Sequence, residues 1–76
     1  MKIKMYTSPY CPFCHRAKDY LNKKGVKYEE VNVLGNLRAA RELVEKSGQD
    51  AVPVIEIGDK IIVGFDPKRI DEALKT

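Results

Sequence analysis

The two cysteines of this chain lie two residues apart, in the segment Cys11-Pro12-Phe13-Cys14. The segment follows a short alternating pattern typical of a strand and begins a pattern typical of a helix. Two cysteines at this spacing, at the start of a helix, predict thiol–disulfide exchange. The thiolate is the nucleophile in that exchange, and a free cysteine near neutral pH is mostly thiol. Unpaired N–H groups and the dipole at a helix N-terminus favour negative charge, so we assign Cys11 as the attacking thiolate.

The residues after Cys11 fit the same interpretation. Pro12 suits the first helical position, where a backbone N–H would have no partner within the helix. Cys14 lies one turn further on, close enough to attack a mixed disulfide formed on Cys11 and release the product. We therefore assign Cys14 as the resolving thiol.

Other readings of the cysteine pair are a buried structural pair or half of a zinc site. Zinc prefers four ligands, and the chain offers only two cysteines and the neighbouring His15, with no second cluster. Catalysis is therefore favoured, and we assign no metal ligands. His15 and Lys18 could each tune a thiol, but solvent-facing positions on the helix are the favoured interpretation for both.

Length and composition set limits on the whole chain. The 76 residues predict a single domain, 1–76, with a thin core. The net charge of +3 is mild and the basic residues are scattered, which argues against binding to nucleic acid or to a membrane surface. No apolar run approaches the ~20 residues that a membrane span needs, and the first residues do not resemble a signal peptide. We expect a cytoplasmic monomer.

Apolar periodicity and turn residues predict an α/β fold. Its order is strand–helix–strand–helix–strand–strand–helix, with a four-stranded mixed sheet and helices on both faces. The first strand–helix–strand unit should be right-handed and parallel, and Gly58-Asp59 predicts a hairpin near the end. The cysteines then follow the carboxyl end of the first strand, a usual place for function in such sheets. The expected elements are strands at 2–7, 26–33, 54–57 and 60–63, and helices at 12–24, about 37–46 and from 67.

The second helix needs one of its faces against the sheet. Its apolar positions predict that this face carries Leu37, Ala40, Leu43 and Val44.

Over essentially its full length the chain resembles the glutaredoxins, and three segments carry the resemblance. The first is the cysteine motif, with Phe13 where many members have tyrosine. The second is Ser47-Gly48 followed by Ala51-Val52-Pro53, which is similar to the family's Thr-Val-Pro segment. The third is Gly64-Phe65-Asp66 before the last helix. The resemblance implies a thioredoxin-type fold, in which Pro53 is cis and faces the cysteines.

The resemblance also implies where a substrate binds. The backbone of Val52 would pair with an extended thiol substrate like an added strand. The family binds glutathione there, as reductant or co-substrate, with no tightly bound cofactor. Asp66 would receive its ammonium group while the helix N-terminus receives the neighbouring carboxylate. Phe13 would pack inward or form a rim. The binding residues implied in this way are Tyr10, Phe13, Val52, Pro53, Gly64, Phe65 and Asp66.

Some positions depart from the family pattern. Ser8 stands where many members have lysine, and Val63 replaces the first residue of a Gly-Gly pair. Ala40 replaces a basic or amide residue that helps to hold the glycyl carboxylate, although Arg38 and Arg41 lie nearby.

We therefore predict a dithiol oxidoreductase that reduces protein disulfides or glutathione mixed disulfides. Two alternatives remain open. Gly64-Phe65-Asp66-Pro67 is similar to the glutaredoxin-like electron donors of ribonucleotide reductase, which thioredoxin reductase recharges. Some glutaredoxins instead share an iron–sulfur cluster between two chains.

Overall fold

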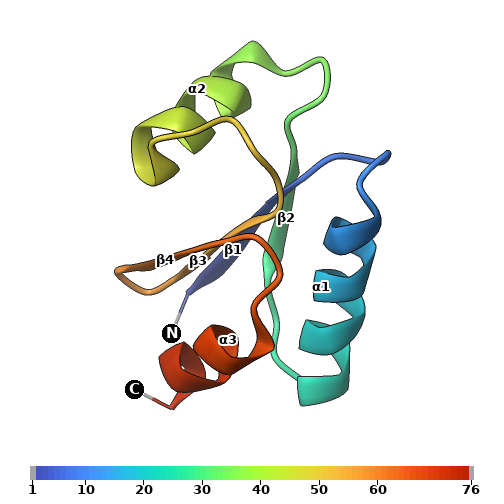
Figure 1. The fold of residues 1–76 in the computed structure, drawn as a ribbon, viewed down its shortest axis with the longest axis vertical. Coiled ribbons are helices and arrows are strands. Elements are labelled where there is room, and N and C mark those ends of the chain that lie inside the picture. The colour runs from blue at the N-terminus through green and yellow to red at the C-terminus, as the bar shows by residue number, and fades with distance from the viewer. Residues whose placement is uncertain (1, 76) are drawn as a thin grey trace.

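The computed structural model describes residues 2–75 and has the predicted order of elements (Figure 1). The sheet has the strand order β2-β1-β3-β4; β1 and β2 are parallel, and the other two pairs are antiparallel. This is the four-stranded mixed sheet of a thioredoxin-like fold, as expected. The elements are β1 (Ile3–Thr7), α1 (Pro12–Lys24), β2 (Glu29–Asn32), α2 (Leu37–Ser47), β3 (Val54–Ile57), β4 (Lys60–Val63) and α3 (Pro67–Leu74).

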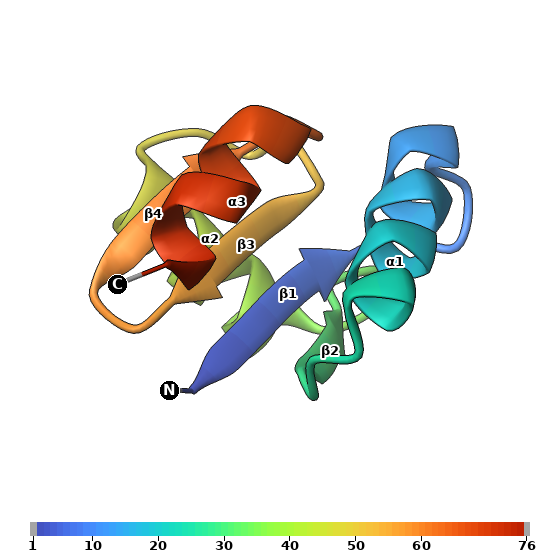
Figure 2. The ribbon, with the colours of Figure 1, turned by 90° about the horizontal axis from the view of Figure 1, so that it is seen from below.

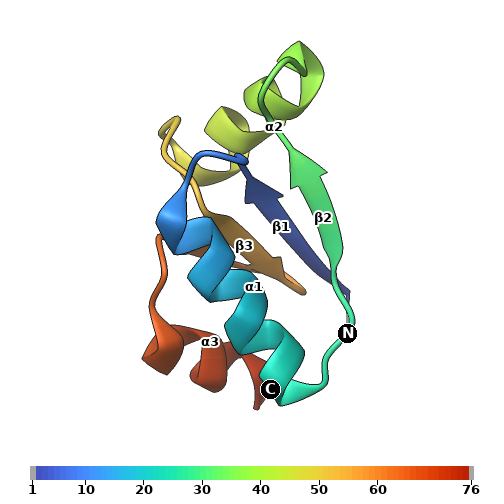
Figure 3. The same ribbon diagram turned by 90° about the vertical axis from the view of Figure 1, so that its right-hand side faces the viewer.

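The helices lie on both faces of the sheet. Figures 2 and 3 show α1 and α3 on one face and α2 on the other. The face under α1 and α3 holds the larger apolar core, and the face under α2 a smaller one. Strands β1 and β3 form the centre of the sheet, so both of their faces are buried. The larger core consists of Ile3, Met5, Ala17, Leu21, Ile55, Ile57, Ile62, Ile70 and Ala73, and the smaller of Tyr6, Leu43 and Val54.

Two expectations about the second strand and the second helix were wrong in part. Strand β2 is shorter than predicted: it pairs with β1 only from Glu29, while Val26 and Tyr28 pack on the larger core from outside the ladder. In α2, Leu37 is 70 % exposed and Val44 is 45 % exposed, so these two do not face the sheet.

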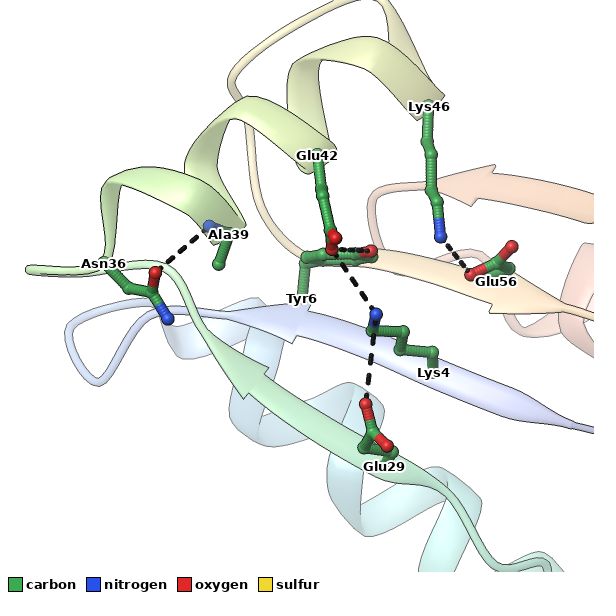
Figure 4. Close-up of polar contacts among 8 residues, drawn as sticks. All are labelled: Lys4, Tyr6, Glu29, Asn36, Ala39, Glu42, Lys46 and Glu56. Carbon is green, nitrogen blue, oxygen red and sulfur yellow. Dashed lines mark hydrogen bonds and ion pairs between the residues drawn. The ribbon is translucent and has the colours of Figure 1, made fainter.

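The face of α2 that does meet the sheet is partly charged (Figure 4). Leu43 is buried there, but Glu42 accepts a hydrogen bond of 3.1 Å from the hydroxyl of the buried Tyr6. Lys46 pairs with Glu56 of β3 at 2.7 Å. This face of the sheet presents polar groups, so the side of α2 that packs against it is partly polar. Apolar periodicity alone therefore does not identify that side.

The helix ends follow from capping chemistry. The Asn36 side chain accepts a hydrogen bond from the Ala39 N–H at the start of α2 (Figure 4). Gly25 ends α1 with a φ of 73°, a left-handed conformation that glycine adopts at low cost. Between residues 2 and 75, no helix is both long enough and apolar enough to cross a bilayer.

We predict that two matched substitutions in α2 will differ sharply in stability. Leu43→Ala should lower the free energy of unfolding by about 2–5 kcal/mol, because it leaves a cavity between α2 and the sheet. Leu37→Ala should change it by less than about 0.5 kcal/mol, because that side chain is largely in solvent. Urea unfolding of both variants measures the difference; equal losses would show that Leu37 and not only Leu43 packs against the protein.

Candidate active site

Cys11 occupies the N-cap position of α1, immediately before the helix. The loop after β1 brings it there, and its own N–H donates to the Ser8 carbonyl at 3.2 Å. Its Sγ accepts a hydrogen bond of 3.3 Å from the backbone N–H of Cys14. A donor aimed at the sulfur and the positive end of the helix dipole both favour a negative charge there. The side chain is partly exposed, so a partner sulfur can approach it.

Cys14 has the opposite environment, although it lies only one turn away. Its side chain is fully buried beneath the first turn of α1. Burial, above all, raises the pKa of the Cys14 thiol; with the hydrogen bond to Cys11 and the charge of Cys11 acting in the same direction, that pKa is about 12. The structure shows both cysteines as free thiols.

The segment before β3 lies against the first sulfur. The Val52–Pro53 peptide bond is cis, as the resemblance implies. The Cys11 thiol donates to the Val52 carbonyl at 3.6 Å, and the Gly64 N–H donates to the Pro53 carbonyl at 2.8 Å. Among residues 2–75, no hydrogen-bond acceptor meets the Val52 N–H. An unpaired N–H beside an accessible sulfur is available to an extended substrate.

The aromatic residues divide between the rim of the site and the core. Tyr10 is 84 % exposed and Phe13 is 54 % exposed, so Phe13 forms a rim and does not pack inward. The Arg16 guanidinium lies 5.5 Å from the centre of the Phe13 ring. Phe65 is different, because its ring packs against the larger core and meets Tyr20 edge-on at 5.8 Å.

Asp66 caps the last helix. Its Oδ1 accepts a hydrogen bond of 3.2 Å from the Arg69 N–H, and its Oδ2 lies 3.9 Å from the Arg69 Nε. The carboxylate is partly exposed, so capping the helix leaves it accessible to a ligand. His15 is exposed, as predicted, and its Nε2 lies 3.4 Å from the Pro9 carbonyl.

The sequence pattern did not predict a polar network that lies under α1. Lys18 Nζ lies 2.9 Å from Glu30 Oε2, and the buried Thr7 hydroxyl donates to the same oxygen at 3.1 Å. Lys18 therefore does not sit on a freely solvated face. Its helical spacing from Cys14 was visible in the sequence, but the partner Glu30 depends on the register of β2 against β1. Among the described residues, no three or more His, Cys, Asp or Glu side chains gather in a way that could hold a metal ion.

Comparison with known proteins places this site in a family. The family model described as glutaredoxin matches residues 3–62. A glutaredoxin-like 8.6 kDa protein of the rubredoxin operon of Clostridium pasteurianum is 40 % identical over 73 residues, which cover 96 % of this chain and 97 % of that protein. Glutaredoxin 3 of Escherichia coli is 41 % identical over 64 residues, which cover 84 % of this chain and 77 % of that protein.

A solved structure shows the same fold. The glutaredoxin-like NrdH-redoxin of Escherichia coli, described as having a thioredoxin-like activity profile, superposes with a TM-score of 0.85 and 33 % sequence identity. The match covers 95 % of this chain and 93 % of that one.

The two cysteines should react with an alkylating reagent in a fixed order. At pH 7 iodoacetamide should modify Cys11 first, because the buried Cys14 with its raised pKa carries almost no thiolate. The rate at Cys14 should grow about tenfold per pH unit above neutral pH, because burial raises the pKa of this thiol and only its thiolate reacts. Intact mass and fragmentation of the peptide identify the modified residue.

Unfolding the protein in urea provides the control for this order, since both cysteines should then react at similar rates. Equal rates in the folded protein would contradict the difference in environment.

Proposed function

The chain belongs to the glutaredoxin family of thiol–disulfide oxidoreductases, and we propose that it reduces protein disulfides and glutathione mixed disulfides through Cys11 and Cys14. The observation that carries the proposal is the contrast between the two sulfurs. Cys11 is accessible and lies at a helix N-terminus, while Cys14 is buried one turn further on. An accessible sulfur can attack an incoming disulfide, and a buried sulfur one turn away can then attack the resulting mixed disulfide.

In the first step, the Cys11 thiolate attacks one sulfur of the substrate disulfide. A bond forms between Cys11 Sγ and that sulfur, the substrate S–S bond breaks, and the other substrate sulfur leaves as a thiolate. The free N–H of Val52 and its carbonyl lie beside this reaction. They would pair with the substrate backbone as an added strand, which supports in-line approach of the substrate sulfur.

In the second step, Cys14 or a glutathione thiolate attacks the adduct on Cys11. With Cys14, the protein ends as a Cys11–Cys14 disulfide and the substrate is released as a thiol, so two protein thiols are oxidised while one substrate disulfide is reduced. When the adduct on Cys11 is glutathione, a second glutathione thiolate can attack its sulfur instead; the bond to Cys11 breaks, Cys11 leaves as a thiolate and glutathione disulfide forms. Cys14 is needed only for the first of these routes.

Glutathione as a partner is supported by the start of α3. The γ-glutamyl end of glutathione carries an ammonium group and a carboxylate close together. The exposed part of the Asp66 carboxylate would receive the ammonium group, and the N–H groups of the first turn of α3 the carboxylate. Ala40 offers no polar group to the glycyl carboxylate at the other end of glutathione. A thiol-rich reducing compartment such as the cytoplasm suits this chemistry.

Two cysteine variants test the assigned roles. Cys11→Ser should abolish reduction of both protein disulfides and glutathionylated substrates, because no nucleophile remains accessible. Cys14→Ser should retain removal of glutathione but lose most of its activity on protein disulfides, because only the reduction of protein disulfides depends on internal resolution by Cys14. Parallel NADPH-coupled assays on a glutathionylated peptide and on a protein disulfide measure the two activities; equal loss in both assays for both variants would contradict the roles.

A second candidate function is electron donation to ribonucleotide reductase, with thioredoxin reductase as the source of electrons. Two observations favour it. Gly64-Phe65-Asp66-Pro67 is similar to the donors of that kind, and the fold matches a neighbour described as thioredoxin-like in its activity. The dithiol chemistry is the same in both cases, and only the recharging partner differs.

The source of electrons can be determined directly. NADPH oxidation should be followed with the oxidised protein and either thioredoxin reductase, or glutathione with glutathione reductase. Turnover with glutathione and its reductase is the result expected from the primary proposal. Turnover only with thioredoxin reductase would replace it by the second candidate.

A further inference from the structure

The polar network under α1 includes Lys18, one helical turn from the buried cysteine. Cys14, Ala17 and Leu21 form the buried face of α1, and Lys18 is four residues after Cys14, on the neighbouring edge of that face. Side chains at this spacing are neighbours on a helix surface. The charge of the Lys18 ammonium group acts on the Cys14 thiol.

The sheet fixes the position of that ammonium group. Glu30 of β2 stands opposite Met5 of β1, so it projects from the same face of the sheet as Met5 and Thr7, toward α1. From there its Oε2 accepts from both Lys18, at 2.9 Å, and the buried Thr7, at 3.1 Å. Two donors on one oxygen hold the carboxylate in place. The Lys18 side chain is only 26 % exposed, so its charge is held between helix and sheet.

We propose that Lys18, anchored by Glu30, is a positioning residue for the resolving step and stabilises the Cys14 thiolate as it forms. This inference rests on the proposed dithiol function. In that step Cys14 loses its proton to water and its Sγ attacks Cys11 Sγ. The bond from Cys11 to the substrate sulfur breaks, and the substrate sulfur leaves with the electron pair. Lys18 stays protonated throughout and exchanges no proton with either sulfur.

The ionisation of the groups involved agrees with this role. The hydrogen bond to Glu30 raises the pKa of Lys18, and the reciprocal bond lowers the pKa of Glu30, so both stay charged at neutral pH. Burial keeps Cys14 protonated, while a backbone hydrogen bond at Ser8 and the charge of Lys18 act in the opposite direction. Cys11 is the other ionisable group that acts on Cys14, and it loses its charge when it forms the adduct. His15 lies near enough to act on Glu30.

The resolving step can be watched directly with an aromatic disulfide that releases a coloured thiolate. In stopped flow, the first release reports attack by Cys11, and a second release that does not depend on reagent concentration reports closure by Cys14. Lys18→Met should slow the second release by about three- to tenfold and move its pH–rate curve to higher pH, the equivalent of half to one pKa unit. Lys18→Arg should restore most of the rate, since it keeps the charge and the carboxylate contact.

Lys23→Met is the matched control, because it removes an exposed lysine from the same helix and should leave the second release unchanged. Urea unfolding of each variant separates a loss of stability from a loss of rate. A second release as fast in Lys18→Met as in the unmodified protein, with the same pH profile, would overturn the inference.

A separate measurement keeps this inference distinct from the proposed function. Absence of any second release in the unmodified protein would refute internal resolution itself. The effect of Lys18 is then decided by alkylation of Cys14 in the Cys11→Ser background at about pH 9. Adding Lys18→Met should slow that alkylation by the same three- to tenfold. Equal rates would overturn the inference whatever the substrate of the protein.

Discussion

The hydrogen bond from the Cys14 N–H to Cys11 Sγ is the contact on which the site depends. Helix N-caps are usually oxygen acceptors, and α2 and α3 follow that rule with Asn36 and Asp66. Only in α1, among the three helices, does a sulfur take this place. A thiolate is a better acceptor for that N–H than a thiol, so the reduced, charged form of Cys11 and the start of the helix stabilise each other.

The spacing of the motif then places the two cysteines in different environments. Cys11 lies just outside the helix, at the end of the loop from β1, and is partly exposed. Three residues of helix rotate the next sulfur toward the sheet, where burial and the neighbouring Cys11 together raise the pKa of Cys14 to about 12. The same burial that protects Cys14 from outside reagents makes its ionisation costly. A cation held nearby, such as Lys18, offsets part of that cost within the fold.

The segments that surround the first sulfur come from distant parts of the chain. The Val52 carbonyl meets Cys11 from the turn before β3, and Gly64, after β4, holds that turn through the Pro53 carbonyl. Strands β1 and β3 are paired neighbours, so the sheet itself sets the distance between the cysteine loop and the Val52 turn. Helix α3 begins three residues after Gly64, which places its N-cap Asp66 at the same end of the molecule.

Much of this arrangement can be predicted from the sequence, because it follows from residues that lie close together in the chain. The cysteine spacing, Pro12 at the first helical position and Gly25 at the end define α1 to the residue. The sheet-facing side of α2 cannot be found in this way, since Glu42 and Lys46 face the sheet only because Tyr6 and Glu56 offer them partners. The anchor of Lys18 is hidden for the same reason, because Glu30 reaches it through the register of two strands.

The central claim is that only Cys11 contacts the substrate disulfide, while Cys14 stays buried until the adduct has formed. Its most direct test is to mix the reduced protein with a disulfide substrate, quench the first turnover with acid, and locate the substrate sulfur by fragmentation of the peptide that contains both cysteines. The structure predicts that the sulfur is found on Cys11 and then disappears as the Cys11–Cys14 disulfide forms. A substrate sulfur found on Cys14, or spread equally over both residues, would contradict the account.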